Sequence, residues 1–173
     1  MSSQDTPSQK EQPVVKCESV YKIFGENAKK MLQSSNGKVD AKEFQDAGCV
    51  VGVNNASFEV YHGEMLVIMG LSGSGKSTLL RCISRLTDTT AGQIFIDGED
   101  LLALSGKELI ELRRNKMGMV FQSFALLPHK TVVENIAFPL QVKGNSTKDS
   151  MTRAMEMVEL VGLAGRENYF PRE

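Results

Sequence analysis

The spacing of hydrophobic residues predicts strands alternating with helices after a polar amino-terminal segment. Residues 1–13 are almost entirely polar and have little to bury, so we expect a disordered tail there. Alternating apolar residues predict strands at 14–25 and at 49–64. Within the second strand, Asn54 and Asn55 are expected to mark a bend or a bulge, because two polar residues in a row interrupt the alternation.

Shorter apolar runs predict three more strands. Residues 65–69 and 117–121 are apolar almost throughout, which is typical of strands buried on both faces of a sheet. The segment 93–96 alternates, and Asp97 with Gly98 is expected to close it in a tight turn. A layer of β structure is therefore expected to flank the buried strand at 65–69.

Helices are predicted where hydrophobic residues recur every three or four positions. Two short helices separated by SSNG are expected between residues 26 and 46, and together they resemble an insertion between strands. A Ser or Thr followed three residues later by Glu is typical of a capping box, which satisfies free N–H groups at a helix start. Two such pairs, Ser105 with Glu108 and Thr131 with Glu134, predict the starts of two further helices.

The last part of the chain is also expected to be helical. Pro139 lies inside the helix that follows Thr131, and proline should kink or end that helix. A final helix is predicted near 147–163, with Met151, Met155 and Val158 on one stripe. A stripe of this kind indicates a side facing the core rather than a cofactor or membrane surface.

The segment between the predicted strand at 65–69 and the next helix has the pattern of a phosphate-binding loop. Its glycines permit a tight turn and a close approach of ligand, because glycine lacks a Cβ. The helix expected at 76–86 presents free N–H groups and its positive dipole end to the loop. The motif G-x-x-x-x-G-K-[ST] runs from Gly70 to Ser77; its Lys reaches the β and γ phosphates and its Ser joins Mg²⁺. A Gly/Ser-rich linker is the alternative, and the flanking strand and helix argue against it. The predicted nucleotide site comprises Gly70, Leu71, Ser72, Gly73, Ser74, Gly75, Lys76, Ser77 and Thr78.

Composition narrows the class of protein only slightly. The 173 residues are 41% hydrophobic and 24% charged, which is ordinary for a folded globular chain. A net charge of −1 supplies no general basic field, so a nucleic-acid partner is disfavoured. Cys17, Cys49 and Cys82 are few and far apart, which indicates unpaired thiols in a reducing compartment. No apolar run approaches the ~20 residues that span a bilayer, so the chain is placed in the cytosol.

The sequence resembles the ATP-binding subunit of an ABC transporter over residues 14–173. The stretches that carry the resemblance are GLSGSGKSTLLRCISRL, GQIFIDGEDL and KMGMVFQSFALLPHKTVVENIAFPL. The insertion after YKIFG and the stretch LLPHKTVVENIAFPL look most like the glycine betaine/proline uptake branch, which also handles related quaternary amines. The resemblance implies an α/β P-loop ATPase core with an antiparallel β subdomain. It also implies a helical insertion at 26–48 and, at 122–173, a Q-loop and an incomplete helical subdomain.

The resemblance assigns roles to single residues around ATP and Mg²⁺. Phe24 matches the aromatic position that stacks on adenine; the alternatives are that Phe24 belongs to the core, or that Tyr21 stacks instead. Gln122 matches the Q-loop glutamine, whose amide oxygen joins the Mg²⁺ shell together with Ser77. A solvated glutamine at the end of a strand is the alternative for Gln122. His129 is expected to be a polar rim residue rather than a catalytic group.

The resemblance also implies partners. A membrane-spanning permease subunit is expected to contact the apolar cluster formed by Phe124, Ala125, Leu126, Leu127 and Pro128. A second ATP-binding subunit is expected in the complete protein, with an extracellular substrate-binding protein acting indirectly. The complete assembly would place this chain on the cytoplasmic face of the plasma membrane.

The chain departs from the family at its carboxyl end. It stops at NYFPRE, where the family continues with its signature motif, its Mg²⁺-binding and water-polarising carboxylates and its switch histidine. The chain therefore looks like an amino-terminal fragment, and no complete catalytic set is expected in it. Hydrolysis should be negligible, because phosphoryl transfer also needs those groups to position water and stabilise charge. Nucleotide binding is expected to persist with reduced affinity if the sheet forms. Strands expected beside 65–69 would be missing, which should leave unpaired strand edges and exposed apolar surface.

Three functions compete on this basis. The first is the energy-coupling ATPase subunit of an importer for glycine betaine, proline or related quaternary amines, or of another importer such as an amino acid type. The second is a catalytically inert nucleotide-binding fragment. The third is a P-loop kinase or DNA-repair ABC protein, which the neutral charge balance and the apolar cluster after Gln122 disfavour.

Overall fold

The computed structural model describes residues 12–122 and 126–173, and it divides into two compact units. The first unit is Met1–Leu109 and the second is Ile110–Glu173. Nearly all of the segment expected to be a disordered tail, residues 1–13, lies outside the described residues.

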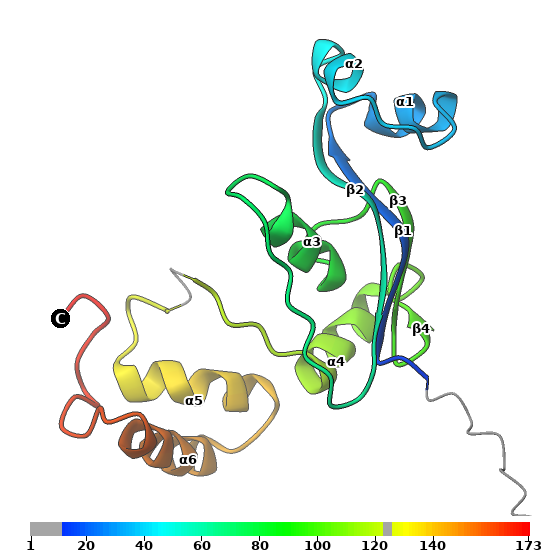
Figure 1. The fold of residues 1–173 in the computed structure, drawn as a ribbon. Coiled ribbons are helices and arrows are strands. Elements are labelled where there is room, and N and C mark those ends of the chain that lie inside the picture. The colour runs from blue at the N-terminus through cyan, green and yellow to red at the C-terminus, as the bar shows by residue number, and fades with distance from the viewer. Residues whose placement is uncertain (1–11, 123–125) are drawn as a thin grey trace, which may run out of the picture. The chain divides into compact units, whose positions relative to one another are not determined.

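The first unit is built on a four-stranded antiparallel sheet (Figure 1). Its strands are β1 (Val15–Phe24), β2 (Val50–Val60), β3 (Ala91–Ile96) and β4 (Glu99–Asp100), in the spatial order β2-β1-β3-β4. β1 pairs with β2 on one side and with β3 on the other. The strands predicted at 14–25, 49–64 and 93–96 are therefore confirmed.

Two predicted irregularities of this sheet are also confirmed. Asn54 and Asn55 of β2 lie opposite the single residue Tyr21 of β1, which is a β-bulge, and Asn55 has a positive φ of 50°. The turn between β3 and β4 has φ of 49° at Asp97 and 80° at Gly98. Positive φ at both central residues is the type I′ geometry that matches the twist of a hairpin.

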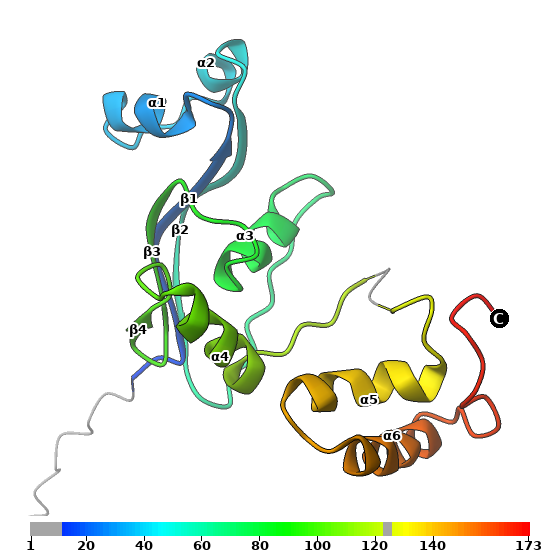
Figure 2. The same cartoon turned by 180° about the vertical axis from the view of Figure 1, so that it is seen from behind.

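The connection from β1 to β2 contains the predicted pair of short helices. These are α1 (Ala28–Ser34) and α2 (Ala41–Asp46), which lie together at one end of the sheet in both ribbon views (Figures 1 and 2). The Asp40 side chain caps α2 by accepting bonds from the N–H groups of Lys42 and Glu43, both at 2.9 Å. One buried cluster joins both helices to the ends of β1 and β2; its members are Ile23, Ala28, Leu32, Phe44 and Cys49.

The prediction of two strands buried on both faces is wrong. Residues 65–69 and 117–121 run without strand or helix assignment. Their side chains are largely open to solvent, with Met65 89% exposed and Val120 99% exposed. A strand of this kind needs a hydrogen-bonded neighbour and cover on both faces. Among the described residues, none pairs with either segment, so their hydrophobicity finds nothing to bury against. The exposed apolar surface expected beside the phosphate loop is therefore present.

The helix after the phosphate loop is α3 (Lys76–Ile83), which ends earlier than the predicted residue 86. It packs against β1 and β2, on one face of the sheet (Figure 1). The next helix, α4 (Gly106–Lys116), crosses the boundary between the units. Its predicted capping box is confirmed, because the Ser105 N–H donates to Glu108 Oε2 at 2.8 Å and Ser105 Oγ accepts from the Glu108 N–H at 3.4 Å.

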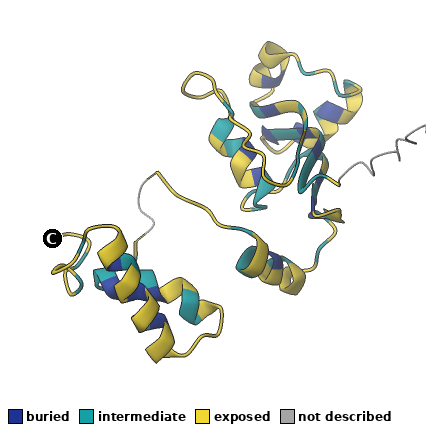
Figure 3. Ribbon diagram, turned by 60° about the horizontal axis from the view of Figure 1, so that its bottom comes forward, coloured by how far each residue is buried: buried dark blue, intermediate teal, exposed yellow. Residues whose placement is uncertain are grey.

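The second unit contains a helical hairpin of α5 (Val132–Val142) and α6 (Thr147–Leu160). The capping box of Thr131 and Glu134 is confirmed, and α5 continues through Pro139 for three more residues rather than ending there. The buried residues of the hairpin gather between its helices (Figure 3); Val133, Ala137 and Ala154 form the cluster. On the predicted stripe of α6, Val158 is buried but Met155 is 39% exposed, so that prediction is wrong for Met155. None of the helices in the described ranges is long and apolar enough to cross a membrane.

Candidate functional site

The candidate site is the loop that joins the extended segment 65–69 to α3. Gly73 and Gly75 have φ of 82° and 92°, a region that side chains other than glycine rarely adopt. Gly75 is also the residue immediately before α3. Gly75, which the motif requires, and Gly73, which it does not, therefore both occupy positions that need glycine for the backbone to turn.

The amino-terminal end of α3 offers N–H groups to a ligand. The Leu79 N–H is the first to bond within the helix, to the Gly75 carbonyl oxygen at 2.8 Å. The N–H groups of Lys76, Ser77 and Thr78 come before it and have no acceptor inside the helix. Together with the helix dipole, these groups favour an anion such as a phosphate.

The Lys76 ammonium group folds back over the loop. Its Nζ donates to the carbonyl oxygens of Gly70 at 2.8 Å and Leu71 at 2.7 Å, and it lies 3.4 Å from Ser74 Oγ. Carbonyl and hydroxyl oxygens are neutral acceptors, whereas phosphate oxygens carry charge and bind an ammonium group more strongly. The Lys76 ammonium group is therefore held at the loop by neutral oxygens, and phosphate oxygens can take their place.

The loop lies close to β2 at Gly52. A Cβ added to Gly75 would overlap the Gly52 carbonyl oxygen. A Cβ added to Gly52 would lie 3.0 Å from Phe24 Cε2 and 3.1 Å from Thr78 Cγ2. Gly52 of β2 thus lies close to the ring of Phe24, the candidate base-stacking residue, and to the first turn of α3.

An open cleft of about 350 Å³ lies between β2 and the loop. It is lined on one side by residues 51–54 and 56 and on the other by the loop and the start of α3, including Ser74, Gly75 and Lys76. The cleft therefore reaches the loop and Lys76, where phosphate binding is expected.

The structure separates the two aromatic candidates. Phe24 is 44% exposed, so it is not a core residue, and the Lys22 Nζ lies 4.8 Å from its ring centroid. The Tyr21 hydroxyl donates to the Gly37 carbonyl oxygen at 3.2 Å, and its ring packs on the cluster that holds α1 and α2. The geometry therefore favours Phe24 over Tyr21 as the stacking residue.

The other predicted site residues lie in the second unit. Gln122 is exposed and lies just after the extended segment 117–121, and its role at Mg²⁺ stays a prediction. Of the cluster expected to contact a permease, Phe124 and Ala125 lie outside the described residues, while Leu126 is 60% exposed. The backbone of the next residue, Leu127, is held by the Asn135 side chain. Asn135 accepts a bond from the Leu127 N–H at 2.7 Å and donates one to the Leu127 carbonyl oxygen at 3.1 Å.

Two features bear on metals and thiols. Within the described ranges, no group of three or more His, Cys, Asp or Glu side chains could hold a metal ion. The role of Ser77 as a ligand of Mg²⁺ stays a prediction; its hydroxyl oxygen is of the kind that Mg²⁺ prefers. All three cysteines are free and buried, and burial raises the pKa of the Cys17 thiol to about 12. A protonated thiol in that position acts as a small apolar side chain.

Sequence reasoning missed Gly52 and Lys22. A glycine inside a predicted strand often marks a close approach of another backbone, and that signal was available at Gly52. Lys22 and Phe24 lie two residues apart in β1, and residues i and i+2 of a strand share a face, so the spacing also offered a signal for this contact.

Comparison with known proteins identifies the family. The profile described as ABC transporter matches residues 53–170 of the chain. With this sheet, this loop and this match, the chain belongs to the ABC transporter family, and its fold is that of an ABC ATPase cassette. The predicted family and fold class are confirmed.

Several curated relatives extend the match. The chain is 82% identical over 161 residues to the trimethylamine N-oxide transport system ATP-binding protein TmoW of Pelagibacter ubique, covering 93% of this chain and 47% of that relative. It is 48% identical over 163 residues to the glycine betaine transport ATP-binding protein OpuAA of Bacillus subtilis, covering 93% of this chain and 39% of the relative. The chain thus spans about half the length, or less, of these relatives.

A solved structure shows the same fold. A dimeric post-hydrolysis state of the ATP-binding cassette MJ0796, bound to ADP and Pi, aligns with a TM-score of 0.71 at 31% identity. The alignment covers 91% of this chain and 62% of that one.

Proposed function

We propose that this chain is the nucleotide-binding part of an energy-coupling ATPase subunit in an ABC importer. The observation that carries the proposal is the loop at Gly70 to Thr78, over which the Lys76 ammonium group lies and after which α3 begins with N–H groups that have no acceptor inside the helix. Membership of the ABC transporter family supports ATP as the nucleotide. In this site, the loop N–H groups and Lys76 bind the phosphates, and Phe24 stacks on adenine.

The residues present fit Mg²⁺ bound together with ATP. The Ser77 side chain is exposed in the first turn of α3, next to the residue whose ammonium group reaches the phosphates. A hydroxyl oxygen is a hard ligand of the kind that Mg²⁺ prefers, alongside phosphate oxygens and water. When bound, the ion neutralises negative charge on the β and γ phosphates.

Hydrolysis and transport belong to the complete protein. The chain covers about half the length of its curated relatives, and phosphoryl transfer needs a positioned water and further charge stabilisation besides the phosphate loop. We propose that hydrolysis drives uptake only when this chain acts with the rest of the subunit, a second ATP-binding subunit and a permease. A nucleotide-binding role without hydrolysis is the alternative for these residues alone.

The transported solute is proposed to carry a trimethylated, positively charged nitrogen. Relatives at 82% and 55% identity are described as trimethylamine N-oxide transport proteins, and a relative at 48% as a glycine betaine transport protein. Both solutes share that nitrogen and carry a nearby negative oxygen. The higher identities favour trimethylamine N-oxide over glycine betaine.

Nucleotide titration of the full-length protein tests the binding site. Lys76→Ala should weaken binding of Mg²⁺·ATP by about tenfold to a hundredfold, because a charge-assisted bond to phosphate is worth ~1.5–3 kcal/mol. Lys107→Ala removes an exposed lysine of α4 and serves as the matched control, with affinity unchanged. Equal ATP affinity in the wild type and Lys76→Ala would overturn the assignment of the loop.

Uptake by the reconstituted transporter tests the solute. Radiolabelled trimethylamine N-oxide should accumulate with ATP and should be competed by the unlabelled compound more effectively than by glycine betaine. Preference for glycine betaine would place the protein with the betaine importers. Preference for methionine would contradict the proposed solute class and match relatives described as methionine import ATP-binding proteins, which are 47% and 45% identical over 124 residues.

A further inference from the structure

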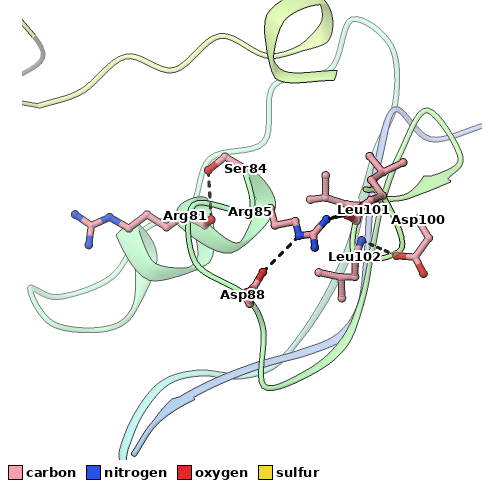
Figure 4. Close-up of polar contacts among 8 residues, drawn as sticks. Arg81, Ser84, Arg85, Asp88, Asp100, Leu101 and Leu102 are labelled. Carbon is pink, nitrogen blue, oxygen red and sulfur yellow. Dashed lines mark hydrogen bonds and ion pairs between the residues drawn. The ribbon is translucent and has the colours of Figure 1, made fainter. Parts of the chain in front are cut away.

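The end of α3 opposite the phosphate loop is tied to a distant turn by one arginine. Arg85 follows the helix and its capping residue, and its Nη1 donates to the carbonyl oxygens of Leu101 at 3.0 Å and Leu104 at 2.7 Å. Its Nε also contacts Asp88 Oδ1 at 3.4 Å. Figure 4 shows the guanidinium group of Arg85 between the end of α3 and the chain that follows β4.

The turn that receives Arg85 is itself well anchored. Leu101 is fully buried, and its N–H donates to the Ile94 carbonyl oxygen of β3 at 2.8 Å. Asp100 Oδ1 accepts from the Leu102 N–H at 2.9 Å, which holds the turn from within (Figure 4). The guanidinium group therefore joins α3 to a rigid part of the β layer rather than to a loose loop.

The backbone of Arg85 has a conformation that is unfavourable for any residue with a side chain. Its φ is 51°, in the left-handed region where a non-glycine residue is strained. Helices commonly end with glycine at such a position. If residue 85 served only to end the helix, glycine would suit it better than arginine. The bonds to Leu101 and Leu104 supply a reason for arginine in particular.

We propose that Arg85 is a positioning residue for the phosphate loop. α3 has eight residues, so its two ends are only about 12 Å apart and move as one rigid rod. Holding the carboxyl end of α3 against the turn at 101–104 fixes the direction in which the amino-terminal N–H groups point. This inference rests on the proposed function, since it assumes that these groups bind nucleotide phosphates.

Arg81 is the matched control on the same helix. It lies one turn before Arg85, is exposed, and its guanidinium group points away from the turn at 101–104 (Figure 4). Substituting Arg81 removes the same charge and the same length of side chain without removing bonds to Leu101 or Leu104.

The experiment measures ATP and ADP affinity and steady-state hydrolysis in the full-length protein. Arg85→Met and Arg85→Gly should each raise the Kd for both nucleotides and the KM for ATP by about five- to tenfold, with kcat at saturating ATP unchanged. Arg85→Lys should recover part of the loss, because a lysine ammonium can reach one of the two carbonyl oxygens. Arg81→Met should change affinity less than twofold.

The outcomes separate this inference from the proposed function. If the wild type binds nucleotide and Arg85→Gly binds it equally well, Arg85 only ends the helix and the inference is wrong. An equal loss of nucleotide affinity in Arg81→Met would show that the effect comes from charge alone, and this result would also overturn the inference. A fall in kcat without a change in KM would contradict a positioning role. Failure of the wild type itself to bind ATP would overturn the proposed function first.

Discussion

Gly75 of the phosphate loop and Gly52 of β2 approach each other so closely that a Cβ on Gly75 would overlap the Gly52 carbonyl oxygen. The two residues are far apart in sequence, and their contact brings the loop against the strand beside Phe24. The loop is thus held by the β layer as well as by its own glycines.

Gly75→Ala is expected to destabilise the fold more than Gly73→Ala. Both residues have φ near 90°, so an alanine at either position costs ~1–2 kcal/mol of backbone strain. Only at Gly75 would the new methyl group also collide with backbone, whereas a Cβ at Gly73 would meet no atom of the described residues within 4 Å. Urea unfolding of the nucleotide-free protein measures the difference. Equal losses of unfolding free energy would show that the contact with Gly52 does not hold the loop.

Replacing the ring of Phe24 is expected to weaken ATP binding. Stacking of a base on an aromatic ring is worth ~1–3 kcal/mol, so Phe24→Leu should raise the Kd by roughly five- to a hundredfold. Phe24→Tyr keeps a ring and should retain most of the affinity. Isothermal titration with ATP measures both variants.

A matched substitution at Tyr21 tests whether Phe24, and not Tyr21, stacks on adenine. Tyr21→Phe removes the hydroxyl that bonds Gly37 and keeps the ring, so the Kd for ATP should be unchanged. A larger loss of affinity in Tyr21→Leu than in Phe24→Leu would reverse the assignment.

The capping box of α5 should make stability depend on pH. Bonds from the Thr131 N–H and hydroxyl lower the pKa of Glu134 below its ordinary value of 4.5. A carboxyl whose folded-state pKa is depressed contributes stability above its unfolded pKa, and that contribution is lost as the pH falls through the folded pKa. The wild type should therefore lose its advantage over Glu134→Gln as the pH falls below about 4.5.

Thermal unfolding of both proteins between pH 7 and pH 3 measures this effect. Thr131→Ala should reduce the dependence, because it removes the hydroxyl of the box while keeping the backbone N–H. A constant difference between wild type and Glu134→Gln across the whole range would rule out the ionised capping box as a source of stability.

The sequence by itself determined the features that depend on neighbouring residues. The hairpin turn at Asp97 and Gly98 and both capping boxes were predicted correctly, because their bonds join residues only a few positions apart. The family could be recognised for the same reason, since its motifs are short and contiguous.

Only the tertiary structure decided which segments pair and which side chains meet. The apolar runs at 65–69 and 117–121 have the composition of buried strands, yet a strand forms only where another chain segment supplies its hydrogen bonds, and none of the described residues does so. The approach of Gly52 to Gly75 and the bonds of Arg85 to Leu101 and Leu104 join residues separated by long stretches of chain. Such contacts follow from the packing of α3 against the sheet, which local spacing does not specify.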